Sequence, residues 1–226
     1  VILADTEAHK VYTASLSKLP LEQYVAIPVG TDEVLFAPNE HPANAPAFQV
    51  FYYGAMVPLH GVEYLIEAAE LLKDTPEISF LIAGKTARYE GKIADANNAG
   101  AHVTCLDWID FNDVPRYISE SAICVAGPFG GTVQSQYVVT GKTHQFLASS
   151  AVALVGRNEA TVLFEDKKNA LVVPQADAQA LADTIRWAYE HRDKLASIGS
   201  NGRELYDQRF SSAHIQQHLA VVLQNL

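Results

Sequence analysis

The sequence predicts an α/β fold with a doubly wound parallel sheet of about six strands. From residue 48 onward, short apolar runs without polar alternation, such as 48–54 and 78–84, indicate strands that are buried on both faces. Between these runs lie segments whose apolar residues recur every three or four positions, which is typical of helices. Several of the apolar runs end in glycine, and ligands bind to such sheets where the strands end.

The predicted strands are short apolar runs bounded by glycine or by polar residues. They are 47–54, 78–84, 101–109, 122–127, 151–156 and 169–173. The segment 61–74 is predicted as a helix because its apolar side chains fall on one helical face, and 113–122 because Pro115 suits a first helical turn. The remaining helices are predicted at 89–100, 142–150, a short one at 160–166, 176–210 with a break near Gly199 or Gly202, and a serine-capped terminal helix at 211–226.

Residues 1–46 have a different character. Residues 1–16 indicate a strand end and a helix, 24–30 a strand, and 31–47 a connector rich in proline, alanine and asparagine. The segment is too short to make a domain, so 1–46 is predicted as the tail of a preceding domain plus a linker. Residues 47–210 then form the main domain and 211–226 a C-terminal helix. An independent core of Val11, Ile27 and Phe36 would contradict this division.

Composition excludes several classes of protein. The 226 residues carry a formal net charge of −10, which argues against general nucleic-acid binding. With 49% hydrophobic residues the chain can bury a sizeable core. No apolar run approaches the roughly 20 residues of a membrane span, and the start does not resemble a signal peptide. Cys105 and Cys124 lie in or beside apolar runs, which favours packed thiols in a reducing, cytoplasmic compartment.

The segment 126–156 is rich in glycine and poor in charge. Between Ala122 and Gly156, Lys142 is the only charged side chain when histidine is neutral. Glycines let a backbone approach phosphate oxygens, and a helix that begins near Lys142 would direct N–H groups to the same place. The segment therefore fits an anion site. The alternative is a tight glycine turn with a solvated lysine, and the pattern alone leaves both open.

Several motifs resemble one enzyme family. These motifs are "DTEAHKVY" at 5–12, "IPVGTDEVLFAP" at 27–38, "YYGAMVPLHGVEYLIEAAELLK" at 52–73 and "GKTHQFLASSAVALVG" at 141–156. They resemble the retaining glycosyltransferases of family 4, which have the GT-B fold, and in particular a subgroup with a Pro-Leu-His-Gly loop. The resemblance extends over almost the whole chain. It implies that the chain is the Rossmann-like, nucleotide-sugar-binding C-terminal domain.

The resemblance also implies a function. The family moves a sugar, as hexosyltransferases do, from a nucleoside diphosphate sugar to an acceptor hydroxyl in glycan or polysaccharide assembly, with no metal or other cofactor. We expect a bacterial, cytoplasmic enzyme, with peripheral association at the inner face of the membrane. A glycan or lipid-linked glycan acceptor would bind through a missing N-terminal domain, so this chain alone would be inactive. Nucleic acid is not an expected partner.

The resemblance assigns roles to particular residues. The residues implied to take part in catalysis are His60, Lys142 and Gln145. Those implied to bind the donor are Gly54, Ala55, Gly84, Trp108, Ile109, Gly130, Gly131, Thr132 and Glu159. The loops after Gly54, Cys105, Gly127 and Gly156 would line one cleft, with Lys142 at its floor. His60 could instead pack a loop, and Trp108 could cap a strand end.

The chain departs from the family pattern at five positions. Ala55 and His60 stand where the family has an arginine and a lysine on the diphosphate, and Tyr137 and Gln145 stand where it has two glutamates. Val162 replaces a further acid. These departures keep a degenerate, non-catalytic binding or scaffold domain as an alternative. A sugar-nucleotide epimerase on the same fold would need a carboxylate pair in the cleft, against which the charge-poor segment argues.

Overall fold

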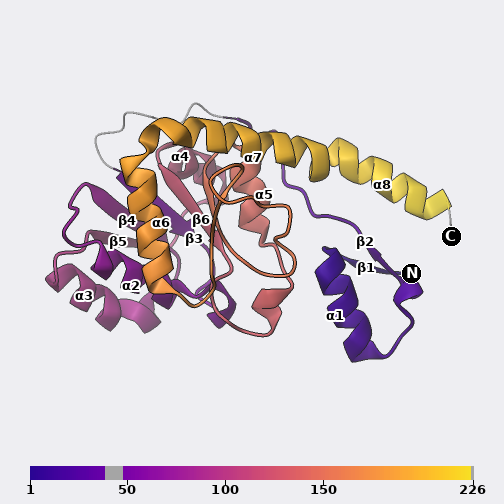
Figure 1. Ribbon diagram of the computed structural model, residues 1–226, viewed down its shortest axis with the longest axis horizontal. Coiled ribbons are helices and arrows are strands. Elements are labelled where there is room, and N and C mark those ends of the chain that lie inside the picture. The colour runs from indigo at the N-terminus through magenta and orange to yellow at the C-terminus, as the bar shows by residue number, and fades with distance from the viewer. Residues whose placement is uncertain (39–47, 225–226) are drawn as a thin grey trace.

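The computed structural model describes residues 1–38 and 48–224 and contains a six-stranded parallel sheet (Figure 1). The strand order is β5-β4-β3-β6-β7-β8. The strands are β3 (Phe48–Tyr53), β4 (Ile78–Ala83), β5 (Val103–Leu106), β6 (Ile123–Gly127), β7 (Ala153–Gly156) and β8 (Leu171–Val173). The predicted doubly wound fold is therefore confirmed.

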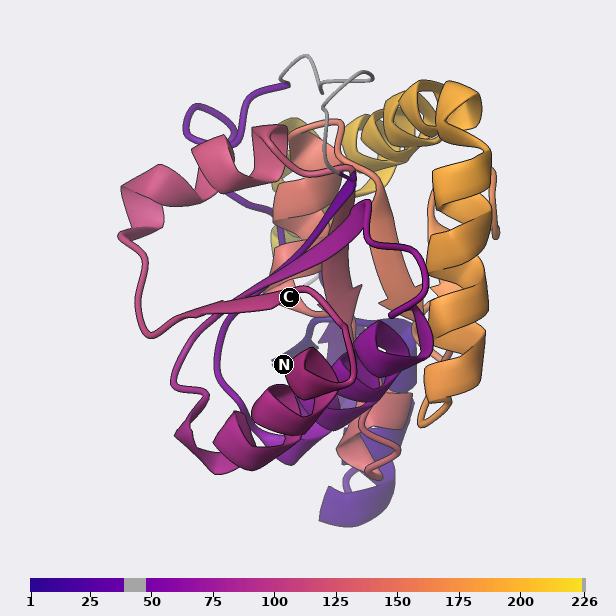
Figure 2. The same cartoon turned by 90° about the vertical axis from the view of Figure 1, so that its left-hand side faces the viewer.

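Helices cover both faces of the sheet (Figure 2). One face packs against α2 (Val62–Leu71), α3 (Glu90–Asn98) and α6 (Ala178–Glu190). The other face packs against α4 (Val114–Ser119), α5 (Gly141–Ala148) and the second half of α7 (Leu195–Arg209). Neighbouring strand residues such as Val50 and Phe51 point into opposite layers, so continuous apolar runs are needed to fill both.

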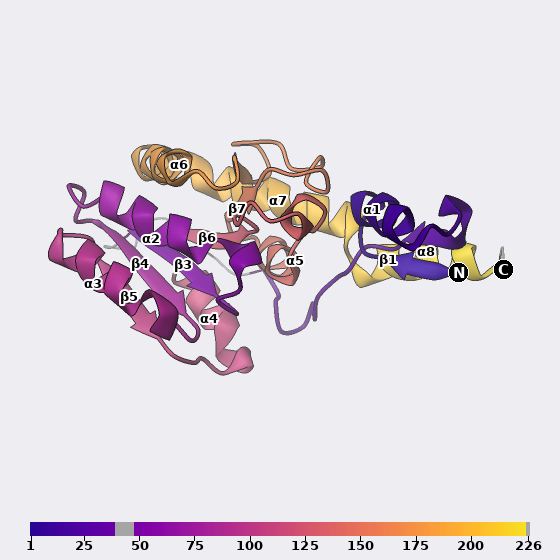
Figure 3. The ribbon, with the colours of Figure 1, turned by 90° about the horizontal axis from the view of Figure 1, so that it is seen from below.

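The N-terminal residues form a small unit at one end of the molecule (Figures 1 and 3). The parallel strands β1 (Ile2–Ala4) and β2 (Tyr24–Ala26) flank α1 (Glu7–Ser17), and the unit lies beside the end of α8 (Ser212–Gln224). Its contact with the main sheet domain includes a stack of the Tyr12 and Tyr137 rings, whose centroids are 4.3 Å apart.

The residues named for an independent N-terminal core do not form one. Val11 is 55% exposed. Phe36 is fully buried, but in the main domain, where it packs among Phe51 and other residues of the sheet. The boundary predicted at residue 46 lies outside the described residues.

Two local predictions were wrong. Residues 160–166 form turns and not a helix, because Asn158 and Thr161 bond to nearby backbone: the Ala160 amide donates to Asn158 Oδ1 at 2.7 Å. The helical segment 176–210 breaks after Glu190, and Gly199 lies inside α7. A Cβ at Gly199 would lie 2.2 Å from the Ser150 carbonyl oxygen, so this glycine allows close packing and does not end a helix.

The terminal helix α8 is capped as predicted, since the His214 amide donates to Ser211 Oγ at 3.3 Å. None of its described residues is buried, and Leu223 is 60% exposed. Among the described residues, no helix has the length and apolar character needed to cross a membrane.

Candidate functional site

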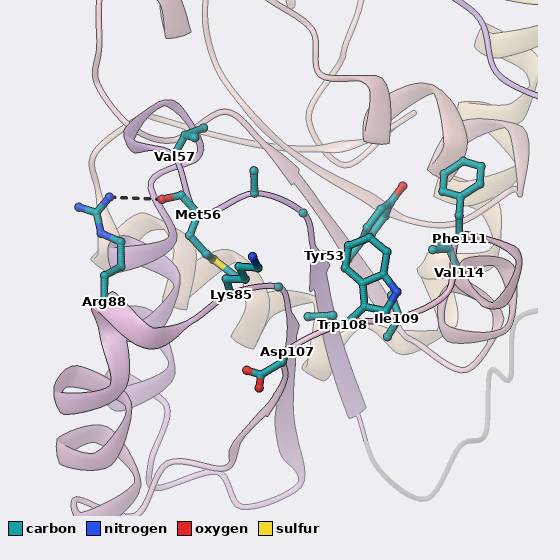
Figure 4. A pocket seen from close by; sticks show the side chains of 14 residues that line it. Tyr53, Met56, Val57, Lys85, Arg88, Asp107, Trp108, Ile109, Phe111 and Val114 are labelled. Carbon is teal, nitrogen blue, oxygen red and sulfur yellow. Dashed lines mark hydrogen bonds between the residues drawn. The ribbon is translucent and has the colours of Figure 1, made fainter.

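A cavity of about 600 Å³ opens at the carboxyl ends of β3, β4 and β5 (Figure 4). Parallel strands end at the same edge of the sheet, so the loops after them meet there. Of the residues predicted to bind the donor, five line this cavity: Gly54, Ala55, Gly84, Trp108 and Ile109. Three charged side chains also line it, namely Lys85, Arg88 and Asp107. The cavity has the size of a site for a small organic ligand.

Glycine is required where the first two loops meet. Gly84 has φ +144°, and a Cβ there would lie 2.3 Å from the Gly54 carbonyl oxygen. Any other residue at position 84 would push the β3 and β4 loops apart and change the floor of the cavity.

Trp108 lines the cavity with most of its side chain in solvent. It is 80% exposed, whereas Ile109 beside it is half-buried. A tryptophan that capped the strand end would be largely buried, so the structure disagrees with that alternative. The exposed indole can offer an aromatic face to a planar ligand group.

Lys142, in the first turn of α5, is only 8% exposed. Its Nζ lies 4.8 Å from the centroid of the Tyr52 ring and 3.3 Å from where a Cβ on Gly54 would stand. Among the described residues no carboxylate forms an ion pair with Lys142. Burial lowers the pKa of Lys142 to about 7. Burial therefore disfavours the charged form of this amine, and a bound anion would favour it again.

His60 is a neutral neighbour of Lys142. Burial, and then the charge of Lys142, lower the pKa of His60 to about 4. Its Nδ1 is buried and, within residues 1–38 and 48–224, has no hydrogen-bond partner. At neutral pH His60 can donate or accept one hydrogen bond, but it does not supply the charge of the family's lysine.

Gln145 is half-buried one turn further along α5. The Tyr53 hydroxyl donates a hydrogen bond to Gln145 Oε1. Tyr53 also lines the cavity, so this bond connects the cavity wall to α5. Gln145 does not itself line the cavity, but its bond to Tyr53 places it near the end of β3, and its half-buried side chain is not in the core behind the helix.

The loop after β6 packs against the loop after β3 and does not line the 600 Å³ cavity. A Cβ at Gly130 would lie 1.8 Å from the Pro58 carbonyl oxygen, and the Gly130 amide donates to Leu59 O at 3.1 Å. Gly130 therefore lets two loops pack backbone to backbone. Gly131 is exposed, and Thr132 Oγ1 accepts from the Ser135 amide at 3.2 Å. None of these three residues lines the 600 Å³ cavity.

Glu159 lies in a second cavity of about 320 Å³, between the N-terminal unit, α5 and α8. Val162 lines the same cavity, together with Asp5, His144 and Arg209. The sequence predicted one cleft for all four loops, whereas the structure places the loop after Gly156 in this separate cavity. Sequence spacing could not predict this separation, because residues that complete the wall of the second cavity, such as Asp5, lie more than 130 positions from Glu159 in the chain.

Sequence reasoning missed Tyr53, Lys85 and Arg88. Tyr53 and Lys85 lie directly beside Gly54 and Gly84, and Arg88 follows four residues after Gly84, in the short 3-10 helix Ala87–Tyr89. Polar side chains at or shortly after such strand ends were the available signal. Among the described residues no group of three or more histidine, cysteine, aspartate or glutamate side chains is placed to hold a metal ion.

The α/β fold is that of the Rossmann-like domain of GT-B proteins. The chain belongs to the family described as glycosyl transferases group 1, whose model matches residues 47–191. No curated protein matches the chain significantly.

Solved structures share the fold at low sequence identity. Anabaena Alr3699/HepE in complex with UDP is 18% identical with a TM-score of 0.83, covering 100% of this chain and 64% of its own. Sucrose-phosphate synthase from Thermosynechococcus elongatus is 23% identical with a TM-score of 0.76, covering 99% of this chain and 57% of its own. S. aureus TarM, in complex with UDP and other ligands, is 20% identical with a TM-score of 0.76, over 95% of this chain and 42% of its own. This chain therefore spans under two thirds of their lengths.

Proposed function

We propose that this chain is the donor-binding half of a retaining glycosyltransferase of family 4, in the subgroup with a Pro-Leu-His-Gly loop. The observation that carries the proposal is the buried amine of Lys142, which lies beside Gly54 and thus beside the 600 Å³ cavity. A buried amine without a carboxylate partner is a poor structural element and a good site for an anion. The UDP complexes of HepE and TarM support a nucleoside diphosphate as that anion.

The geometry suggests how the donor lies. Its base and ribose occupy the cavity, with the base against the exposed Trp108 indole. Its diphosphate crosses Gly54, where the absence of a side chain leaves the path to Lys142 open. As the bond from the anomeric carbon to the diphosphate oxygen breaks, negative charge grows on the diphosphate and Lys142 stabilises it. The neutral ring of His60 donates a hydrogen bond to the diphosphate or to a sugar hydroxyl of the donor.

The whole protein's role follows from the same proposal. A hexosyl group would pass to a glycan or lipid-linked glycan acceptor in bacterial polysaccharide assembly, without a metal or other cofactor. The acceptor would bind outside residues 1–226, and the enzyme would work in the cytoplasm or at the inner face of the membrane. Residues 1–226 alone would then bind the donor without turning it over.

Calorimetry of the chain with UDP, GDP and their glucose conjugates tests donor binding. We expect saturable binding of the ligands of one base, either uridine or guanosine. The nucleoside diphosphate should compete with its own sugar conjugate, and no sugar should be released from the conjugate. A chain that binds none of these ligands would contradict the proposal.

A second candidate is a binding or scaffold domain that has lost catalysis. Neutral residues favour it, because they stand where the family has charged ones: Ala55, Tyr137, Gln145 and Val162. The Tyr12 ring also stacks on the Tyr137 ring and so covers one face of it. A transfer assay of the full-length protein with a panel of donors separates the two, because a scaffold would bind without turnover.

A further inference from the structure

We infer that Tyr53 is a positioning residue, whose hydroxyl fixes the Gln145 side chain so that its amide nitrogen, and not its oxygen, is presented to the nucleotide-sugar donor. The inference rests on the proposed function, since it assigns a role toward the proposed donor. Neither residue pattern nor family membership assigns any role to Tyr53.

The Tyr53 ring is held on two sides. It stacks on Phe51 with ring centroids 5.7 Å apart, and it meets the Phe146 ring edge-on at 6.1 Å. Phe51 belongs to β3 and Phe146 to α5, so the ring is wedged between the sheet and the helix. The hydroxyl therefore has a defined position, which is the requirement for orienting a neighbour.

The hydroxyl is a donor over the whole physiological pH range. Burial is the main cause that raises the pKa of Tyr53, so the phenol stays neutral. It donates to Gln145 Oε1, and within residues 1–38 and 48–224 the Gln145 side-chain nitrogen forms no hydrogen bond. The two N–H groups of that nitrogen are then available to acceptor oxygens of a ligand.

An amide needs such a partner, whereas a carboxylate does not. The two oxygens of a glutamate are equivalent, so either rotamer presents the same group. The two ends of a glutamine differ, and a flip about the last side-chain torsion exchanges a donor for an acceptor. A diphosphate and the ring and hydroxyl oxygens of a sugar all accept hydrogen bonds. An amide that turned its oxygen toward these acceptor atoms would form no hydrogen bond with them, so with glutamine at position 145 the Tyr53 hydroxyl is the group that selects the productive orientation.

The test measures UDP affinity of the chain by calorimetry for wild type, Tyr53→Phe, Gln145→Ala and the double variant. Loss of one hydrogen bond predicts that each single variant weakens UDP about threefold to tenfold. Because Tyr53 acts through Gln145, the double variant should be no weaker than the weaker single variant. Tyr117→Phe is the matched control: Tyr117 also stacks on Phe51, at 5.6 Å, but Gln145 Oε1 accepts its hydrogen bond from Tyr53 and not from Tyr117. The UDP affinity of Tyr117→Phe should therefore stay within about twofold of wild type.

A second measurement detects orientation itself. The Gln145 side-chain amide signals in a ¹H–¹⁵N spectrum, assigned by their loss in Gln145→Ala, should shift when UDP is added to wild type. In Tyr53→Phe that shift should be lost or strongly reduced, even if folding stability also changes.

The outcomes separate this inference from the proposed function. The positioning role would be wrong if the losses of UDP affinity in the two single variants multiplied in the double variant. It would also be wrong if Tyr53→Phe kept full UDP affinity and an unchanged Gln145 amide shift. Either result leaves UDP binding itself intact. Absence of UDP binding by wild type, and of any donor from the panel above, would overturn the proposed function and this inference with it.

Discussion

Replacing Lys142 by methionine keeps most of the side-chain volume and removes the amine. If Lys142 contacts the donor diphosphate, the variant loses one charge-assisted hydrogen bond, worth about 1.5–3 kcal/mol. That free energy corresponds to an affinity loss for UDP of about tenfold to 150-fold. The exposed Lys168, which pairs with Glu165 at 2.8 Å, supplies the matched control in Lys168→Met. An unchanged affinity in Lys142→Met would refute the assigned role.

The same amine predicts a pH dependence. Its pKa is lowered to about 7 by burial, and a bound diphosphate raises that pKa again because it stabilises the charged form. Binding above neutral pH therefore takes up a proton, and UDP affinity falls as pH rises, by up to about tenfold per unit. Of the groups that face Lys142, burial keeps the Tyr52 phenol neutral there, and His60, with a pKa of about 4, does not titrate.

Calorimetry from about pH 7 to about pH 9, in two buffers of different ionisation enthalpy, counts the protons taken up; at these pH values the UDP phosphates no longer change charge. Wild type should take up a growing fraction of one proton, and Lys142→Met none. If the UDP affinity of wild type did not change with pH across this range, Lys142 would either remain charged throughout or lie too far from the ligand to contact it. Stability gives an independent reading: an unfolded lysine has a pKa of about 10.4, so the stability of wild type relative to Lys142→Met should rise between about pH 7 and about pH 10. The comparison cancels the opposite contribution of Cys105 and Cys124, whose pKa values burial raises. Lys142→Met should also melt higher than wild type at neutral pH.

Three further predictions concern other residues that the sequence pattern selected. Trp108→Ala should weaken UDP about fivefold or more by calorimetry, from the loss of base stacking, with no change in melting temperature because the side chain is 80% exposed. Gly130→Ala should lower the melting temperature, since its Cβ would lie 1.8 Å from the Pro58 carbonyl oxygen; equal stability would mean that the two loops part easily. In the full-length enzyme, Gln145→Glu should weaken UDP binding, because it replaces the amide N–H donors by a carboxylate that repels the diphosphate. At saturating donor it should keep or raise turnover, because a carboxylate favours positive charge at the anomeric carbon. A fall in turnover at saturating donor would show that the neutral amide is required.

The class of fold was readable from the sequence because it depends on local pattern. Apolar runs such as 78–84 can be buried on both faces only inside a covered parallel sheet, and helical periodicity at 61–74 supplies one cover. Local reasoning failed where a few side chains decide the backbone. Asn158 and Thr161 hold turns in a segment whose composition suits a helix, and Gly199 passes through α7 without ending it.

Part of the candidate site was also readable. Gly54, Gly84, Trp108 and Ile109 follow strand ends, and the parallel sheet brings those ends to one cavity. Lys142 was conspicuous as the one charge in a long neutral segment. Its burial and its position beside Gly54 were not readable, since they depend on how α5 packs over the end of β3.

Tertiary structure alone decided which loops share a wall. Glu159 lies in the second cavity, and Gly130 allows close backbone contact with Pro58. Tyr53 bonds to Gln145, which is 92 positions further along the chain. Strand and helix patterns specify elements and their order, because the forces behind them act over a few residues. The proton affinity of Lys142 and the orientation of Gln145 depend on distances set only when distant elements pack together.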